Sequence, residues 1–183
     1  QKLRRFDTGR LEEERLIDDL TRAGIEVMNS QESVRALGGH LRGKLDGIVD
    51  GLPETDQMAV LECKSHNDRS FKEVQKKGVR ESKPTHFAQC QLYMHLRALR
   101  KCLYLAVNKN TDEVHAEILD FDEAYCRTLL LKLERIIQSA KPGPKIAEKP
   151  DKWPCVLCNQ KAVCHAENFA RKNCRTCIHA TPI

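Results

Sequence analysis

The segment GKLDGIVD at residues 43–50 and the segment MAVLECK at residues 58–64 decide which fold this sequence predicts. Both segments combine apolar and β-branched residues, which is typical of strands, and the turn-rich segment GLPETD at residues 51–56 separates them. We therefore predict a β-hairpin. Asp46 lies on its first strand, and Glu62 and Lys64 lie two residues apart on its second strand, where alternate side chains share one face.

This hairpin would bring two carboxylates and one ammonium group together. If Asp46 faces Glu62 and Lys64, the carboxylates can hold a hard divalent cation such as Mg²⁺ or Mn²⁺. The cation would activate a water and clamp a phosphate, and the lysine would position the nucleophile. A Glu-x-Lys pair on a strand is more often a solvated ion pair. Here both acids lie in apolar segments, where burying a lone carboxylate is costly, and this favours a site.

The ordered residues resemble the PD-(D/E)xK nuclease superfamily, and most closely its RecB-like and YqaJ (lambda-exonuclease-like) branches, which are often phage-encoded. Those branches also carry Gly-x-x-x-(Glu or His) on the first helix and Gln-x-x-x-Tyr on the helix after the hairpin. This chain has Gly9 before Glu13, and Gln89 before Tyr93. The resemblance implies an α/β fold of the α+β mixed-sheet type, with a restriction-endonuclease-like αβββαβ core flanked by helices.

The resemblance also implies the roles of the site residues. The implied metal ligands are Glu13, Asp46, Glu62 and the carbonyl of Cys63, and the residues implied for the attacking water and the substrate are Lys64, Gln89 and Tyr93. Three consecutive acids, at positions 12, 13 and 14, point in directions about 100° apart on a helix, so only one of them can face the hairpin. The resemblance selects Glu13, although acids at a helix N-terminus also stabilise the helix itself.

The remaining elements follow from hydrophobic periodicity. We predict a helix at 8–24 capped by Asp7 or Thr8, strands at 25–28 and 33–37, and a helix at 84–99. We further predict strands at 102–107 and 114–119, and a helix at 121–140 with five aliphatic residues facing inward (Leu129, Leu130, Leu133, Ile136 and Ile137). His40 is a candidate phosphate or metal contact, although a surface histidine in a glycine turn is the commoner case. The basic segment 64–83 is either a nucleic-acid track or solvated surface.

Composition places few restrictions on the function. The chain has 183 residues, of which 31% are charged and 40% hydrophobic, and a formal net charge of +5. We predict a nuclease core at 1–140, a proline-rich linker at 141–154 and a small Cys-rich metal-binding tail at 155–183. No apolar segment approaches a membrane span and no secretory signal is present. Because the chain begins at Gln1, we expect a trimmed start.

Nine cysteines raise the question of disulfides, but their distribution argues for a metal. Four are scattered through apolar segments, where thiols behave as small hydrophobic groups. The other five are Cys155, Cys158, Cys164, Cys174 and Cys177. The two Cys-x2-Cys pairs are separated by 15 residues, in the range of structural zinc sites. We therefore expect a reducing cytoplasm, which is the bacterial host's cytoplasm if the protein is phage-encoded.

Zinc has one competitor at these cysteines. The spacing Cys-x2-Cys-x5-Cys also resembles RecB-family nucleases that hold a [4Fe–4S] cluster. Those nucleases take a fourth cysteine from a position before the core, and no cysteine precedes Cys63 here, which favours zinc. His165 and His179 are further candidate ligands.

The sequence therefore favours a Mg²⁺- or Mn²⁺-dependent DNA nuclease, which we expect to be an exonuclease of phage or prophage recombination or repair type. A recombination or single-strand-binding protein would be a further partner. The alternative is a non-catalytic nucleic-acid-binding or assembly module that uses the Cys-rich tail, and the complete set of acids with Lys64 argues against it. An enzyme acting on a substrate other than DNA is the third candidate, since a fold does not fix a function.

Overall fold

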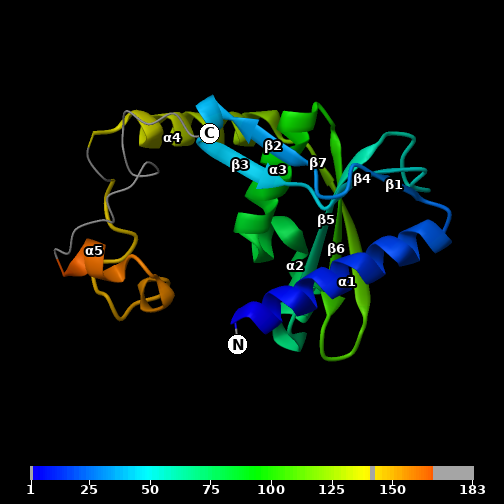
Figure 1. Cartoon of the computed structure of the whole chain (residues 1–183), viewed down its shortest axis with the longest axis horizontal. Helices are drawn as coiled ribbons and strands as arrows, with labels where there is room; N and C mark the ends of the chain where they lie inside the picture. Colours follow the sequence, from blue (N-terminus) through cyan, green and yellow to red (C-terminus); the bar gives the residue numbers. More distant parts are fainter. Residues whose placement is uncertain (1, 141–142, 167–183) are drawn as a thin grey trace.

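A five-stranded mixed sheet forms the centre of the molecule (Figure 1). The computed structural model describes residues 2–140 and 143–166, with side chains from residue 7 onward. The strands are, in spatial order, β1 (Glu26–Met28), β4 (Gly47–Asp50), β5 (Ala59–His66), β6 (Lys101–Asn108) and β7 (Val114–Asp120). Strands β5 and β6 are parallel, and the other neighbours are antiparallel. The predicted mixed α/β core with αβββαβ order is confirmed, with β7 as an additional edge strand.

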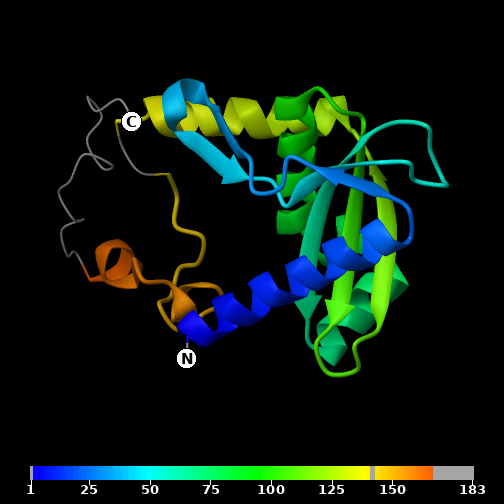
Figure 2. The same cartoon turned by 45° about the vertical axis from the view of Figure 1, so that its right-hand side comes forward.

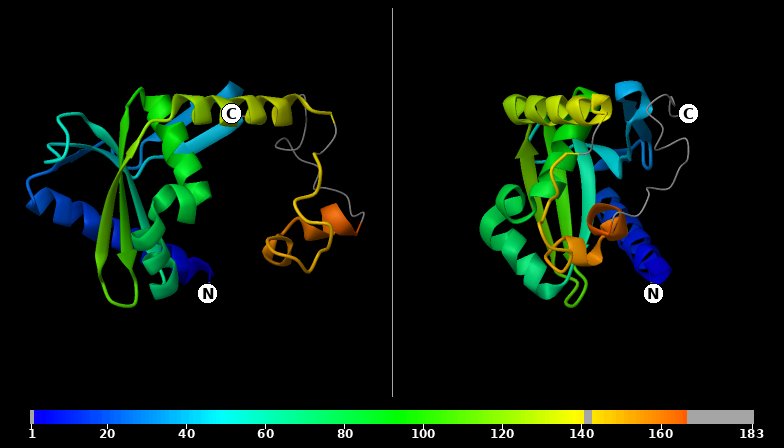
Figure 3. Two further views of the ribbon diagram at one scale, coloured as in Figure 1. Left: turned by 180° about the vertical axis from the view of Figure 1, so that it is seen from behind. Right: turned by 90° about the vertical axis from the view of Figure 1, so that its left-hand side faces the viewer.

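Helices cover both faces of this sheet, as the views from behind and from the side show (Figure 3). Helix α1 (Lys2–Arg22) packs Leu16 and Leu20 against one face. Helices α2 (Asp68–Ser82) and α3 (Pro84–Arg97) pack against the other face. Helix α4 (Glu123–Gln138) contacts α3. The two hydrophobic cores on either side of the sheet hold α1 and α3 in fixed positions around the central strand β5.

Strand β5 separates its residues between these two cores. Ala59 and Leu61 are fully buried in the core beneath α1, and Val60 is fully buried in the core beneath α3. Because side chains alternate along a strand, Glu62 and Lys64 follow Val60 onto the α3 side. The acid and the lysine therefore share a face, as the sequence predicts.

A small second sheet interrupts the predicted first strand. Strands β2 (Ser33–Ala36) and β3 (Leu41–Lys44) pair with each other and are joined by the 3₁₀ turn η1 (Leu37–Gly39). The prediction of one continuous strand over 43–50 is therefore wrong, because the chain leaves β3 after Lys44 and enters β4 at Gly47. The break is stabilised by the buried Leu45, whose N–H donates to the carbonyl of Glu32 at 3.0 Å.

Two further helix predictions need correction. Helix α1 begins at Lys2, so neither Asp7 nor Thr8 caps its N-terminus. Of the residues of α4, only Cys126 is buried, and Ile136 is 59% exposed, so the prediction that Ile136 faces inward is wrong, whereas the other four aliphatic residues of that predicted face are half-buried. Figure 2 shows the reason, because α4 extends along the top of the molecule beyond the five-stranded sheet.

The described part of the C-terminal region contains two short helical turns, η2 (Cys155–Leu157) and α5 (Lys161–His165). Its predicted separation into a linker at 141–154 and a tail at 155–183 stays a prediction. None of the helices in the described ranges is both long and apolar enough to cross a membrane.

Candidate active site

Asp46 lies in the break between β3 and β4 rather than on a strand. Its Oδ2 atom accepts a hydrogen bond from the backbone N–H of Cys63 at 2.7 Å, which fixes the carboxylate against the edge of β5. Burial raises the pKa of Asp46, and the hydrogen bond from Cys63 and the charge of Lys64 lower it in part. The break in the predicted strand therefore allows the carboxylate to reach β5.

Glu62 is fully buried on the central strand, unlike every other acid whose burial the structure describes. Its Oε1 atom contacts the ammonium group of Lys64, whereas its Oε2 atom has no hydrogen-bond partner among the described residues. Burial raises the pKa of Glu62 to about 7, against the opposing charge of Lys64. A buried carboxylate oxygen without a donor is rare and costly, and an absent ion is one of its physical explanations.

Lys64 is half-buried beside Glu62. Burial disfavours its charged form, but the neighbouring Glu62 carboxylate outweighs burial and raises the pKa of the ammonium group. The Nζ atom also lies 3.3 Å from the carbonyl oxygen of Cys63. The ammonium group of Lys64 therefore donates hydrogen bonds to a carboxylate and to a backbone carbonyl.

Glu13 contributes a third carboxylate from α1. Its side chain is half-buried, and Oε1 accepts a hydrogen bond from the side chain of Gln31 at 2.5 Å. Burial raises the pKa of Glu13, and the charge of Asp46 raises it further, so the two acids lie within electrostatic range of each other. The adjacent Glu14 instead forms an exposed ion pair with Arg10 at 2.8 Å.

One cleft, with a volume of about 850 Å³, lies between α1 and β5 next to the buried Glu62, which does not line it. Its lining includes Glu13, Asp46, Cys63 and Lys64. In the described residues, no group of three or more His, Cys, Asp or Glu side chains is close enough to enclose a metal ion. One oxygen of each acid accepts from Gln31, from the N–H of Cys63 or from Lys64.

The donor set nevertheless fits a hard cation. Glu13 and Asp46 line the cleft together with Lys64, Glu62 is buried beside Lys64, and burial raises the pKa of all three acids. Oxygen ligands of this kind are those that Mg²⁺ and Mn²⁺ prefer. The unpartnered Oε2 of Glu62 is the atom that such a cation would satisfy.

Gln89 and Tyr93 lie one turn apart on α3, on the same side of β5 as Glu62. The side-chain amide of Gln89 donates to the hydroxyl of Tyr93 at 3.3 Å. Burial raises the pKa of Tyr93, and the charge of Glu62 acts in the same direction. Tyr93 also contacts β3, where a Cβ atom on Gly43 would lie only 2.5 Å from its hydroxyl oxygen. Because Gly43 has no side chain, β3 can approach Tyr93 closely.

A polar cluster beside this site was not predicted from the sequence. The hydroxyl of Tyr104 lies 3.0 Å from Nε2 of His66 and 2.7 Å from Nδ1 of His86, and Nδ1 of His66 lies 3.0 Å from Ser70 Oγ. Burial lowers the pKa of both histidines to about 4, and Lys83 and Lys64 lower it further. His86 precedes Gln89 by three residues on α3, and this helical spacing is the signal from which it could have been found.

The other predicted ligands lie elsewhere. His40 is exposed at the end of η1 and does not line the cleft. In the tail, Cys155 is buried, and Cys158 and Cys164 are exposed free thiols. Cys174, Cys177 and His179 lie outside the described residues. The Nε2 atom of His165 is buried without a hydrogen-bond partner in the described part of the chain.

The basic segment after Lys64 forms α2 and is largely neutralised. Five of its cations pair with acids, namely Arg69 and Lys83 with Glu73, Lys72 with Asp68, Lys77 with Glu81, and Arg80 with Asp122. The alternative of a solvated, charge-balanced surface therefore describes α2 better than a nucleic-acid track does.

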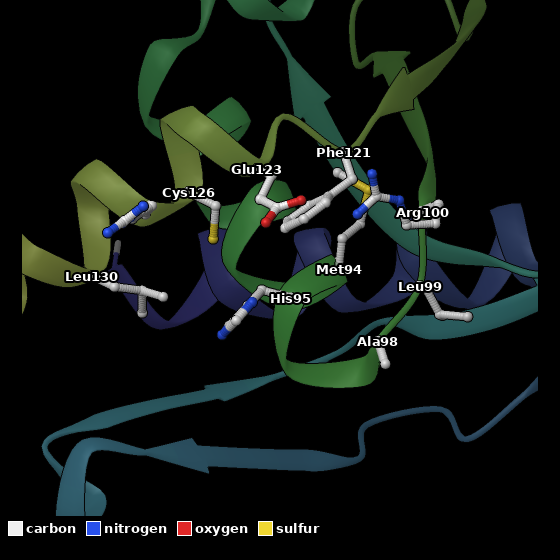
Figure 4. Close-up of a pocket in the computed structure, with 10 residues that line it drawn as sticks. Met94, His95, Ala98, Leu99, Arg100, Phe121, Glu123, Cys126 and Leu130 are labelled. Atoms are coloured by element: carbon white, nitrogen blue, oxygen red, sulfur yellow. The ribbon is translucent and has the colours of Figure 1, made fainter.

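A second pocket, with a volume of about 520 Å³, lies at the C-terminal end of α3 and shares no lining residue with the cleft (Figure 4). The guanidinium group of Arg100 lies 4.7 Å from the centre of the Phe121 ring. The ring of His95 stacks on the same ring, with centroids 6.3 Å apart. Phe121 therefore contacts both a cationic and an aromatic side chain in this pocket.

The comparisons with known proteins support the fold. No family model matches the chain, and no curated protein matches it. The structure is similar to the crystal structure of an alkaline exonuclease from Laribacter hongkongensis, with a TM-score of 0.53 and 17% identity over 66% of this chain. That match spans only 59% of the exonuclease. A second similar structure, SSO0001, has a TM-score of 0.54 and 17% identity over 88% of this chain and 71% of its own. The chain therefore shares its fold with an exonuclease.

Proposed function

We propose that this chain is a metal-dependent nuclease that hydrolyses phosphodiester bonds in DNA. The observation that carries the proposal is the buried Glu62, which has one oxygen on Lys64 and the other without a partner. Asp46 and Glu13 complete an acidic cleft next to it. The shared fold with an exonuclease supports the same reaction class, and the ordered motifs agree with it.

Glu13, Asp46 and Oε2 of Glu62 are the groups that would hold Mg²⁺ or Mn²⁺, with the carbonyl of Cys63 as a further ligand. When bound, the cation supplies a water of lowered pKa and a clamp for the scissile phosphate. The chain's own part is to orient these acids. The hydrogen bond from Cys63 to Asp46 and the one from Gln31 to Glu13 perform this orientation.

Lys64 acts as a donor rather than as a base. Its raised pKa keeps a proton on Nζ at neutral pH, where the ammonium group orients the attacking water and offsets negative charge on the phosphate. Gln89 and Tyr93 supply uncharged donors from α3, on the Glu62 side of β5, which would orient the substrate.

The finer assignment is an exonuclease of recombination or repair type, as the motif order implies. We also propose that the tail from 155 onward is a separate metal-binding unit that holds zinc, with [4Fe–4S] as the alternative. The N–H of Gln160 lies 3.4 Å from the sulfur of Cys158 and is directed at it, and the orphaned Nε2 of His165 supports the same proposal.

Cleavage of labelled DNA tests the nuclease proposal. Purified protein is incubated with linear end-labelled DNA and with circular DNA, in Mg²⁺, in Mn²⁺ or in EDTA. We expect cleavage in either metal, none in EDTA, and circular DNA to remain intact because an exonuclease needs an end. Absence of metal-dependent cleavage of both forms would refute the nuclease, whereas cleavage of circles would refute only the exonuclease.

A further inference from the structure

The outward face of the β2–β3 hairpin carries three exposed cations, Arg35, Arg42 and Lys44, which we call the basic face of the hairpin. Figure 1 shows this hairpin lying apart from the five-stranded sheet. Val34 and Gly43 point to the opposite face of the hairpin, where Val34 is buried in the core and Gly43 meets Tyr93. The alternation of the two strands therefore places all three cations on the side away from the core.

Two of these cations oppose each other directly. Arg35 and Arg42 are partners in the antiparallel register, and Lys44 follows on the same face opposite Ser33. Like charges directly opposite on paired strands are destabilising. No acidic side chain of a described residue lies within salt-bridge distance of these three cations, in contrast to the paired cations of α2. The fold thus retains an uncompensated positive charge that a bound anion would offset.

The basic face is fixed relative to the candidate active site. At the base of the hairpin, Glu32 accepts the N–H of Leu45 at 3.0 Å and forms an ion pair with Arg97 of α3 at 2.7 Å. Ser30 and Gln31, just before the hairpin, line the cleft. Lys44 precedes Asp46 by two residues. A polynucleotide that is bound in the cleft is therefore within reach of the hairpin.

We propose that the basic face of the hairpin binds the phosphate backbone of the polynucleotide whose bond is cleaved in the cleft. This inference rests on the proposed function. Arginine matches phosphate because its planar donors bind two oxygens at once. Arg42 and Lys44 are two residues apart on a strand, which spaces their backbones by about 6.8 Å and presents a row of cations rather than a single site. Such a row suits a repeating anion.

Salt-dependent DNA binding tests the inference without requiring cleavage. The variant Arg35→Gln/Arg42→Gln removes two charges and also the repulsion between them, so we expect it to fold at least as stably as the wild type. The control Lys76→Gln/Lys132→Gln removes two exposed charges that have no salt-bridge partner among the described residues. Fluorescence anisotropy with labelled duplex and single-stranded DNA in EDTA gives the slope of log K against log salt concentration.

We expect the hairpin variant to reduce the magnitude of this slope by about 1.8 for duplex and about 1.4 for single strands, because each phosphate contact contributes about 0.9 or 0.7. The control should leave the slope unchanged. An unchanged slope in the hairpin variant, an equal change in the control, or a wild-type protein that binds neither probe would overturn the inference. The salt slope tests DNA binding by the hairpin even if the wild type cleaves no DNA. A protein that binds DNA through the hairpin but cleaves none would refute only the nuclease proposal.

Discussion

Glu13 and Glu14 are adjacent acids in different environments, and this difference makes a residue-scale prediction. Glu13 is half-buried within range of Asp46, whereas Glu14 pairs with Arg10 on the surface. We expect Glu13→Gln to lower metal-dependent cleavage by at least about 10–100-fold, the cost of losing even an outer partner of a metal site. Glu14→Gln, the matched control, should change stability by only tenths of a kcal/mol and leave cleavage intact.

The same comparison of cleavage rates can contradict this assignment. If Glu13→Gln cleaves at the wild-type rate while Glu14→Gln is inactive, the acid that belongs to the site has been misidentified.

The two histidines around Tyr104 predict a pH dependence of stability. Burial lowers the pKa of His66 and of His86 to about 4, from 6.5. Above pH 6.5 both are neutral whether the chain is folded or unfolded. As the pH falls through 6.5 towards 4, only the unfolded chain binds the protons, so the free energy of unfolding falls by about 1.4 kcal/mol per pH unit for each histidine.

Urea unfolding of the wild type and of His86→Gln at about pH 7 and about pH 5 measures this contribution. The variant should lose less stability than the wild type over that interval. The control His40→Gln, at an exposed residue, should behave like the wild type. Equal pH dependence in all three proteins would show that His86 is not held neutral by the fold.

At the scale of elements, the close contact between β3 and α3 makes a further prediction. A Cβ atom on Gly43 would lie 2.5 Å and 2.6 Å from two atoms of the buried Tyr93 side chain. We expect Gly43→Ala to cost about 1–3 kcal/mol, as overpacking of a core does. Gly43→Ala should also lower the cleavage rate, because the added methyl group would push Tyr93 and the β2–β3 hairpin apart.

The matched control is Gly9→Ala in α1, where a Cβ atom would meet nothing within 4 Å. Alanine inside a helix should stabilise the protein by about 0.5–1 kcal/mol relative to glycine. Thermal unfolding of both variants tests the pair, and equal stability of Gly43→Ala and the wild type would mean that the two elements do not touch as described.

The elements that the sequence predicts best are those whose local pattern and tertiary environment agree. Strand β6, helix α3 and strand β5 lie where apolar and capping signals place them. The break at Leu45 and Asp46 could not be predicted, because two long-range bonds cause it, from Leu45 to Glu32 and from Cys63 to Asp46. Helix α4 misled the prediction because periodicity reports an apolar face but not whether a sheet lies beneath it.

The candidate site divides in the same way. The sequence predicts which acids come near β5, since alternation and helical spacing are local rules. The Glu62–Lys64 contact also follows from local spacing, whereas the hydrogen bond from Gln31 to Glu13 could not be predicted, because it joins side chains of two different elements. The residues His66 and His86 were missed because they meet only through Tyr104, on another strand. The catalytic roles of all these residues stay predictions.

At the scale of the whole molecule, charge is distributed unevenly. The net charge of +5 would suggest a basic surface, but most cations of α2 pair with acids, whereas those of the hairpin do not. The composition alone could not distinguish these two arrangements. The tail adds an independent prediction: elemental analysis of the purified chain should find zinc, and a chain that holds neither zinc nor iron and forms disulfides there would contradict a metal-binding tail.

The metal-dependent cleavage rate of Glu62→Gln tests the central claim most directly. The matched control is Glu117→Gln on β7, where the carboxylate accepts the N–H of Val79 at 2.9 Å and lies 3.9 Å from Nε2 of His115. We predict that Glu62→Gln folds, because it removes a buried charge, but cleaves end-labelled duplex DNA in Mn²⁺ at least about a hundredfold more slowly than the wild type. Glu117→Gln should cleave at the wild-type rate. Cleavage by Glu62→Gln at the wild-type rate would contradict the claim that this cleft is the active site of a nuclease.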